Sequence, residues 1–267
     1  MKIVRMVTEV RDHLREPRRR GERIGLVPTM GALHEGHRSL LDAARAACDV
    51  VVMSLFVNPS QFDAADDLAR YPRDESADAA VAADAGVDLL FAPDPEELYP
   101  PGFDTWVDPG ELGEVLEGAA RPGHFRGVAT VCAKLFSIVG PDAAYFGEKD
   151  AQQVAVIRQV VRDLDLPVEI VAMPTIREAS GLALSSRNRF LSPAERTVAL
   201  ALPRALEAGR EAHRAGADAV AAVRAVLDAQ PGLSVDYVDV AEFGAPTLVA
   251  AIRVGPTRLI DNVRLDR

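Results

Sequence analysis

The sequence is short of cysteine, of aromatic residues and of positive charge. Its two cysteines, Cys48 and Cys132, lie in apolar stretches and lack the C-x-x-C spacing of a structural zinc site, so we expect both to be small buried hydrophobic residues. Lysine and arginine total 30 against 40 aspartates and glutamates, which gives a formal net charge of −10. This balance argues against broad nucleic-acid binding, although a few local cations at a helix N-terminus can still hold one triphosphate.

Long apolar runs and three common catalytic signatures are also missing. No run approaches the length that spans a bilayer, and residues 1–20 lack the apolar region of a signal peptide, so we expect a cytoplasmic protein without membrane association. There is no G-x-x-x-x-G-K-[ST] loop, no G-x-S-x-G elbow and no H-E-x-x-H motif. The spacing from His34 to His37 is one residue too short for the zinc motif, and we predict no resident metal site.

What is present along the first two thirds of the chain is an alternation of short apolar runs with helix-like segments. This alternation is typical of a parallel sheet covered by helices on both faces, and it predicts an α/β fold. The strands are expected at 23–27, 50–57, 87–92, 143–146 and 168–171, and the helices at 36–48, 74–85, 128–139 and 151–164.

The pattern changes after about Pro174. Ser192, Pro193 and Glu195 together predict a helix start, with serine as N-cap, proline at the first position and glutamate three residues after the serine. Alanine- and arginine-rich helices follow to about residue 229, and strands are expected at 235–240 and 258–263. We therefore predict a larger domain over 1–175 and a smaller α+β domain over 176–267.

The first candidate site is the run from Pro28 to His37, PTMGALHEGH, which follows a strand and opens a helix. Gly31 and Gly36 allow the backbone to approach a ligand closely. His34 and His37 lie at a helix N-terminus, where free N–H groups and partial positive charge suit a phosphate. A metal pair or two surface histidines would be the alternative for an isolated H-x-x-H.

The second candidate site, Phe146-Gly147-Glu148-Lys149-Asp150 with Gln153, also lies between a strand and a helix. Ligands of open parallel sheets bind outside the carboxyl ends of the strands, which would present the Lys149 cation to a phosphate. A helix cap formed by Asp150 beside a solvated lysine is the simpler interpretation.

Three further polar segments are ambiguous on their own. They are Asn58-Pro-Ser-Gln61-Phe62, the basic segment from Arg121 to Gly127, and the segment from Arg177 to Asn188. Gln61 could orient a small polar substrate, either Arg121 or Arg126 could meet a carboxylate, and the serines with Arg187 could clamp a phosphate. The alternatives are a turn at the end of a strand, a surface charge and a polar linker.

Taken together, these motifs resemble the pantothenate synthetase family. The run 28–37 is similar to the HIGH-type signature of the nucleotidyl-transferase superfamily, and Ser185-Ser186-Arg187-Asn188 resembles its KMSKS-type loop. PTMGALHEGH, NPxQF, RPGHFRGV, FGEKDxQQ, GLALSSRN and TRLIDN occur in the order and spacing of the family, from about Ile24 to Asn262.

The resemblance implies a Rossmann-like N-terminal domain that holds the active site and a C-terminal domain that acts as a lid. It implies that ATP activates pantoate as an adenylate, which β-alanine then converts to pantothenate. Magnesium would enter with ATP. The partners would be these small molecules and a second copy of the chain in a homodimer, with no nucleic acid and no membrane.

The resemblance also implies roles for individual residues. His34, His37, Lys149, Ser185, Ser186 and Arg187 would act on the phosphates, with His37 in the position usually assigned to a proton donor. Gln61 and Gln153 would hold pantoate, and Gln61 would also lie close to β-alanine. The ATP-binding residues would be Met30, Gly31, Ala32, Leu33, His34, Glu35, Gly36, His37, Gly147, Glu148, Lys149, Asp150, Ile176, Leu184, Ser185, Ser186 and Arg187.

The chain departs from the family pattern at two positions. Ser180 stands where aspartate is usual, and Leu184 stands where methionine is common. Neither removes a group that we assign to chemistry.

Two alternatives to the ligase function are another nucleotidyl transferase of the superfamily with a different acceptor, and a non-catalytic nucleotide sensor. The sensor would normally have lost Lys149 or the histidines, and all of them are present.

Overall fold

The computed structural model describes residues 1–62, 68–69 and 71–266, and the chain divides into two units. The first comprises Met1–Gly147 and Gln152–Met173, and the second comprises Glu148–Ala151 and Pro174–Arg267. The second unit thus includes one short segment from the middle of the chain. The division into domains at residue 175 stays a prediction, since two units in one structure do not establish which segments fold independently.

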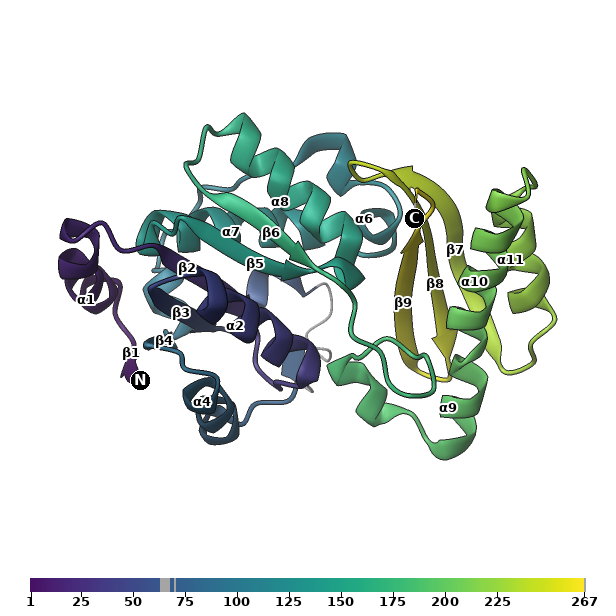
Figure 1. Ribbon diagram of the computed structural model, residues 1–267, viewed down its shortest axis with the longest axis horizontal. Coiled ribbons are helices and arrows are strands. Elements are labelled where there is room, and N and C mark those ends of the chain that lie inside the picture. The colour runs from purple at the N-terminus through teal and green to yellow at the C-terminus, as the bar shows by residue number, and fades with distance from the viewer. Residues whose placement is uncertain (63–67, 70, 267) are drawn as a thin grey trace. The chain divides into compact units, whose positions relative to one another are not determined.

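A parallel six-stranded sheet forms the centre of the first unit, in the order β1-β4-β3-β2-β5-β6 (Figure 1). Every pairing between neighbouring strands is parallel, which confirms the predicted α/β class. The strands are β1 (Lys2–Val4), β2 (Ile24–Thr29), β3 (Val50–Leu55), β4 (Leu89–Phe91), β5 (Ala143–Gly147) and β6 (Glu169–Met173).

Both faces of this sheet are apolar over strands β2 to β5, because alternate residues of these strands enter different cores. In β3, Val50 and Val52 belong to one core and Val51 and Met53 to the other. Helices α1, α7 and α8 pack on the first core, and α2 and α4 pack on the second. The helices of this unit are α1 (Val7–Arg19), α2 (Glu35–Ala47), α4 (Glu75–Asp84), α5 (Pro95–Leu98), α6 (Glu117–Ala120), α7 (His124–Val139) and α8 (Ala151–Asp163), with 3-10 turns η1 (Pro59–Gln61) and η2 (Gly110–Gly113).

The two cysteines belong to these cores. Cys48 and Cys132 are both free and buried, as the sequence predicts. Burial raises the pKa of the Cys132 thiol to about 12, so this thiol stays protonated and unreactive at neutral pH.

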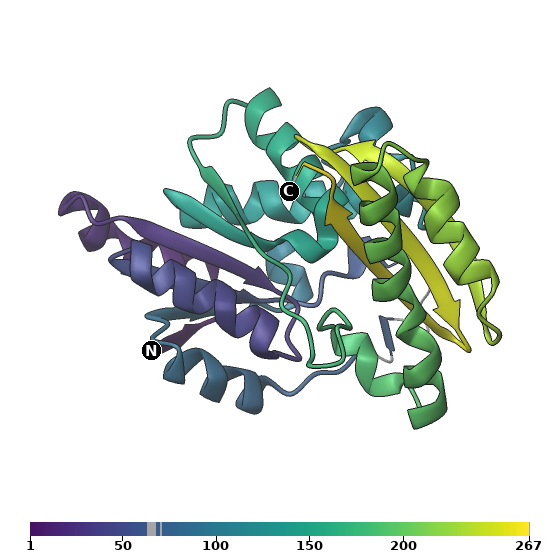
Figure 2. The same ribbon diagram turned by 45° about the vertical axis from the view of Figure 1, so that its right-hand side comes forward.

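The second unit contains a three-stranded antiparallel sheet, β7-β8-β9, covered on one face by α10 and α11 (Figure 2). Gly209 of α10 allows the close approach, because a Cβ there would lie 2.5 Å from the Leu248 side chain of β8. The elements are η3 (Glu148–Asp150), η4 (Ser186–Phe190), α9 (Pro193–Ala199), α10 (Ala201–Arg214), α11 (Ala219–Asp228), β7 (Leu233–Glu242), β8 (Pro246–Val254) and β9 (Thr257–Arg264).

The predicted helix start at Ser192 is confirmed. The Ser192 hydroxyl accepts a hydrogen bond from the Glu195 amide, and the Glu195 carboxylate accepts one from the Ser192 amide. Other boundaries differ from the prediction. Helix α7 begins at His124 rather than at residue 128, so residues 124–127 of the basic segment 121–127 are helical. Strands β1 and β8 and helix α1 were not predicted.

Within the described part of the chain, no helix combines the length and the apolar character needed to cross a membrane.

Candidate active site

The segment between β2 and α2 turns sharply just after the strand ends at Thr29. Gly31 has φ +85°, and Ala32 has φ +53°, a left-handed conformation that costs an ordinary residue about 1–2 kcal/mol. A Cβ on Gly31 would lie 2.7 Å from the Asp78 carboxylate and 2.9 Å from Leu55. Glycine is therefore required at position 31, and the strain at Ala32 must be offset by other interactions.

Asp78 provides that compensation. Its carboxylate, on the first turn of α4 and only 4% exposed, accepts hydrogen bonds from the Ala32 amide at 2.9 Å and the Leu33 amide at 2.8 Å. Hydrogen bonds to an ionised group contribute about 1.5–3 kcal/mol each. Asp78 thus fixes the backbone immediately before His34, and the sequence analysis missed it because it lies inside an ordinary helical pattern.

The two histidines of this segment cap α2 and pack against each other. His34 is the N-cap, and its Nδ1 accepts a hydrogen bond from the Gly36 amide at 3.1 Å. The Nδ1 of His37 accepts one from the His34 amide at 3.3 Å, and the two ring centroids are 4.3 Å apart. Because both Nδ1 atoms accept, each neutral ring carries its proton on Nε2. Both rings can therefore offer an Nε2–H group to an anion at the helix N-terminus.

Gln61 is held in place by contacts to its side chain and to its backbone carbonyl. It is 7% exposed and ends η1, which Asn58 caps. Asn58 Nδ2 donates to Gln61 Oε1 at 3.1 Å, which turns the amide nitrogen of Gln61 toward Met30 Sδ, 2.9 Å away. The Gln61 carbonyl oxygen lies 2.8 Å from His124 Nδ1 and accepts from Arg121 at 3.1 Å. The structure thus joins the Met30 and Gln61 segments, and a pocket of about 330 Å³ lined partly by Met30 opens beside them.

Gly127 lets α7 approach η1, and its replacement tests the placement of Gln61. A Cβ on Gly127 would lie 2.3 Å from the Ser60 carbonyl oxygen and 2.8 Å from the Gln61 amide nitrogen. If Gln61 holds pantoate, as the family resemblance implies, we expect Gly127→Ala to lower the free energy of unfolding by roughly 1–3 kcal/mol and to raise the KM for pantoate at least about tenfold. Thermal unfolding and steady-state kinetics measure the two effects, with Ser137→Ala on exposed α7 surface as control. An unchanged KM for pantoate would separate Gln61 from substrate binding.

The second candidate segment follows β5. A Cβ on Gly147 would meet no atom of the described residues within 4 Å, so packing does not require glycine at this position. Gln153 lies half-buried in the first turn of α8. Its neighbour Gln152 is buried and bonds the Leu112 and Val115 carbonyls, which gives Gln152 a structural role that Gln153 does not share.

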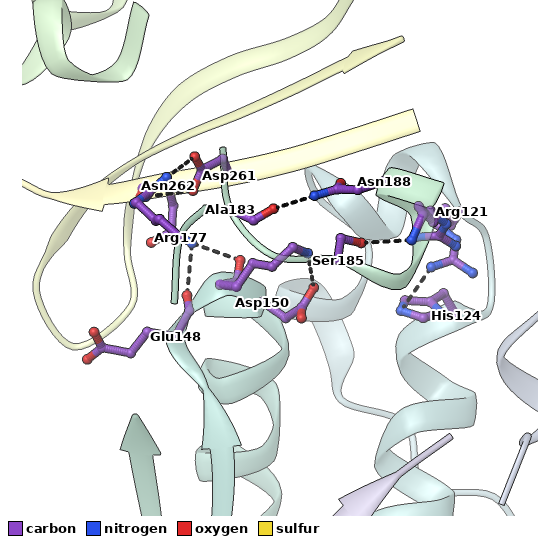
Figure 3. A network of polar contacts seen from close by, with 12 residues as sticks. Arg121, His124, Glu148, Asp150, Arg177, Ala183, Ser185, Asn188, Asp261 and Asn262 are labelled. Atoms are coloured by element: carbon purple, nitrogen blue, oxygen red, sulfur yellow. Dashed lines mark hydrogen bonds and ion pairs between the residues drawn. The ribbon is translucent and has the colours of Figure 1, made fainter. Parts of the chain in front are cut away.

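In the second unit, Lys149, Ser185 and Arg187 line one narrow cavity of about 10 Å³, the size of a single water. The Lys149 ammonium lies 3.5 Å from Asp150, and its side chain is 19% exposed. Ser185 caps η4 by accepting from the Arg187 amide at 3.3 Å, and Ser186 is the first residue of that turn. Upstream, the Leu184 amide donates to the Ile176 carbonyl at 2.9 Å. The unit therefore brings two cations and a serine hydroxyl to one cavity, and Figure 3 shows Ser185 of this group together with Asp150 and Asn188.

The candidate residues fall in both units. Met30 to His37, Gln61, Gly147 and Gln153 lie in the first, and Glu148 to Asp150, Ile176 and Leu184 to Arg187 lie in the second. Among the described residues, no group of three or more histidine, cysteine, aspartate or glutamate side chains is arranged to hold a metal ion.

Comparison with known proteins identifies the family. The family model described as pantoate-beta-alanine ligase matches residues 2–264. The chain belongs to the pantoate-beta-alanine ligase family. Pantothenate synthetase from Moorella thermoacetica is 52% identical over 280 residues, which cover 100% of this chain and 99% of the relative.

Solved structures of the family share the fold. Pantothenate synthetase from Thermus thermophilus has a TM-score of 0.93 and 48% identity, with 99% of each chain covered. Pantoate-beta-alanine ligase from Francisella tularensis, solved in complex with beta-gamma ATP and beta-alanine, has a TM-score of 0.86 and 35% identity, covering 100% of this chain and 98% of that one. The Rossmann-like sheet with a small C-terminal sheet is thus the fold of this ligase family.

Proposed function

We propose that this chain catalyses the ATP-dependent condensation of (R)-pantoate with β-alanine to give pantothenate, AMP and pyrophosphate through a pantoyl-adenylate. The observation that carries the proposal is the match of residues 2–264 to the pantoate-beta-alanine ligase family, with HEGH at the N-terminus of α2. The complex of the Francisella tularensis relative with beta-gamma ATP and beta-alanine supports ATP and β-alanine as substrates in this proposal.

The first step joins pantoate to AMP. A carboxylate oxygen of pantoate forms a bond to the α-phosphorus of ATP while the bond from that phosphorus to the bridging oxygen breaks, and pyrophosphate leaves. Lys149, Arg187 and the Nε2–H groups of His34 and His37 donate to the phosphate oxygens as negative charge moves onto the pyrophosphate. Ser185 and Ser186 add hydroxyl donors. Magnesium arrives as part of the Mg–ATP substrate, because a triphosphate supplies most of the ligands that this ion needs.

The second step uses the energy of the mixed anhydride. The neutral amine of β-alanine attacks the carbonyl carbon of the adenylate, the bond from that carbon to the phosphate oxygen breaks, and AMP leaves with that oxygen. The new amide nitrogen then releases a proton. Gln61 and Gln153 hold the pantoyl group, and the contact of Asn58 with Gln61 orients the amide that would donate to it. Activation is needed because a carboxylate oxygen leaves poorly whereas AMP leaves easily.

The release of AMP and pyrophosphate from ATP, Mg²⁺ and pantoate, with and without β-alanine, tests the proposal. We expect sustained turnover only with both acids, with one AMP for each pantothenate. Without β-alanine, pyrophosphate release should stop after about one equivalent of enzyme, because the adenylate stays bound. A folded, ATP-binding protein that does not turn over pantoate and β-alanine would reject the proposal, and a screen of other acceptors would then separate another nucleotidyl transferase from a nucleotide sensor.

Arg187→Ala separates the phosphate contacts from the pantoate contacts. The Arg187 guanidinium lines the same cavity as Lys149, whereas Gln61 lies in the first unit. We expect the KM for ATP to rise about tenfold or more while the KM for pantoate changes less than about twofold. Initial rates over a grid of both substrates measure the two constants, with Arg214→Ala on α10 as a control for removing an arginine. Unchanged ATP kinetics would remove Arg187 from the site.

The family resemblance also supports a homodimer that acts in the cytoplasm, and we include both in the proposal. Sedimentation equilibrium over a range of protein concentrations tests the dimer, since a monomer mass at micromolar concentration would reject it.

A further inference from the structure

Two adjacent residues of β9 contact both cation-bearing segments of the second unit. Successive side chains of a strand point to opposite faces, so Asp261 and Asn262 can reach different neighbours. Figure 3 shows Asp261 beside Arg177 and Asn262 beside the backbone of Glu148. Neither side chain is assigned to a substrate in the proposed reaction.

Asn262 holds the segment that carries Lys149. Its Nδ2 donates to the carbonyl oxygens of Glu148 and Lys149, both at 2.9 Å, and the residue is 9% exposed. One amide group thus fixes two consecutive peptide units of η3. The backbone from which the Lys149 side chain extends is therefore tied to β9 within the second unit, to which Glu148–Ala151 belongs.

Asp261 holds the segment that leads to Ser185. Its side chain is 1% exposed and forms a bidentate ion pair with Arg177, at 2.7 and 3.0 Å. The Arg177 side chain also donates to the Gly181 carbonyl, and its backbone forms an antiparallel β-bridge with Ala183. These two contacts close the loop just before Ser185.

A second set of bonds holds the same loop from its other end. Asn188 Nδ2 donates to the Ala183 carbonyl and to Glu178, each at 3.0 Å, and Glu178 pairs with Arg196 at 2.6 Å. Burial acts to raise the pKa of Glu178, but the bonds from Arg196 and Asn188 outweigh it and lower the pKa below its ordinary value. Glu178 therefore stays ionised, and the loop stays tied, at neutral pH.

We infer that Asp261 and Asn262 are positioning residues for the reaction, which set the Lys149 segment and the Ser185–Arg187 loop at a fixed spacing before ATP binds. The inference rests on the proposed function. It adds that the triphosphate meets a preorganised pair of cations, so that little reorganisation is needed as charge moves onto pyrophosphate. A strand of the C-terminal sheet, distant in sequence from Lys149, would thus control the first step and not the second.

Pantoate-dependent exchange of pyrophosphate into ATP measures the first step alone and tests this role. Asn262→Ser keeps one donor, and Asn262→Asp replaces both donors by acceptors that face two carbonyl oxygens. We expect the exchange rate to fall about tenfold in the serine variant and about 100-fold in the aspartate variant, with the KM for pantoate unchanged within about twofold. Ser234→Ala, on exposed surface of β7, is the control.

A double-mutant cycle separates positioning from general stability. If Asn262 acts through Lys149, Asn262→Ser changes the residual exchange rate of Lys149→Ala less than about twofold. A second cycle combines Asp261→Asn with Arg187→Ala, and here too the first change should alter the residual exchange rate of the Arg187→Ala enzyme less than about twofold. Wild-type exchange by the folded serine variant, or a full additional loss in the Lys149→Ala background, would overturn the inference. An inactive wild-type enzyme would instead reject the proposed function, so the two failures are distinguishable.

Discussion

Lys149→Ala should lower the rate of adenylate formation by about 100- to 1000-fold while the protein stays folded. The reason is the position of Lys149. It lines a cavity together with Arg187 and Ser185, and its backbone carbonyl accepts a hydrogen bond from Asn262. Removal of a preorganised cation affects the transition state more than the ground state, so kcat should fall more than the KM for ATP rises. Exchange of pyrophosphate into ATP in the presence of pantoate measures this step directly.

Two variants give this prediction its controls. Lys149→Arg retains the charge in a different shape and should recover part of the lost rate. Lys2→Ala removes an exposed lysine from the edge strand β1 and should leave the exchange rate unchanged. Near-normal turnover by a folded Lys149→Ala protein would remove Lys149 from the mechanism.

Asp78→Ala should lower both stability and activity, although Asp78 is not expected to touch a substrate. The change leaves the partly buried amides of Ala32 and Leu33 without their acceptor, and an unsatisfied buried amide costs about 1–3 kcal/mol. The strained backbone at Ala32 would relax, and this change would displace His34 and His37, which come shortly after Ala32 in the sequence. We expect the free energy of unfolding to fall by roughly 2–5 kcal/mol and kcat to fall about 100-fold. Urea unfolding and initial rates at a temperature where the variant is folded measure the two effects.

The same helix supplies the control for this prediction. Asp84→Ala removes an exposed carboxylate from α4 that pairs with Arg38, and such surface ion pairs contribute little to stability. Asp78→Asn should lose part of the same stability, because its oxygen can accept from one of the two amides while its NH2 group would face the other backbone donor. Full activity in the folded Asp78→Ala protein would show that the segment before His34 holds its shape without this carboxylate.

The sequence predicts the sheet well, since strands buried on both faces stand out as short apolar runs between helices. β3 and β5 were found in this way, and their boundaries differ from the prediction by at most two residues at either end. β8 was missed because its run of valine, leucine and alanine is apolar without alternation, so it gave no period by which to separate strand from helix. The order of the strands within the sheet was not predictable, because it depends on contacts between segments that are distant in the sequence.

The candidate site was predictable only in its local parts. The turn at Gly31 and the cap at His34 depend on neighbouring residues, and the motif contains them. The carboxylate of Asp78 and the amide of Asn262 act on backbone groups 45 or more residues away, at Leu33 and at Lys149. Asp78 lies in an ordinary helical pattern, and the TRLIDN motif contains Asn262 without indicating which backbone groups its side chain contacts.

The most direct test of the proposed mechanism follows the fate of the pantoate oxygens. Pantoate labelled with ¹⁸O in both carboxylate positions is incubated with ATP, Mg²⁺, β-alanine and the enzyme, and the products are analysed by mass spectrometry. A pantoyl-adenylate predicts one ¹⁸O atom in the phosphate of each AMP and one in the amide carbonyl of pantothenate. AMP without label, or label in pyrophosphate or inorganic phosphate, would contradict the adenylate.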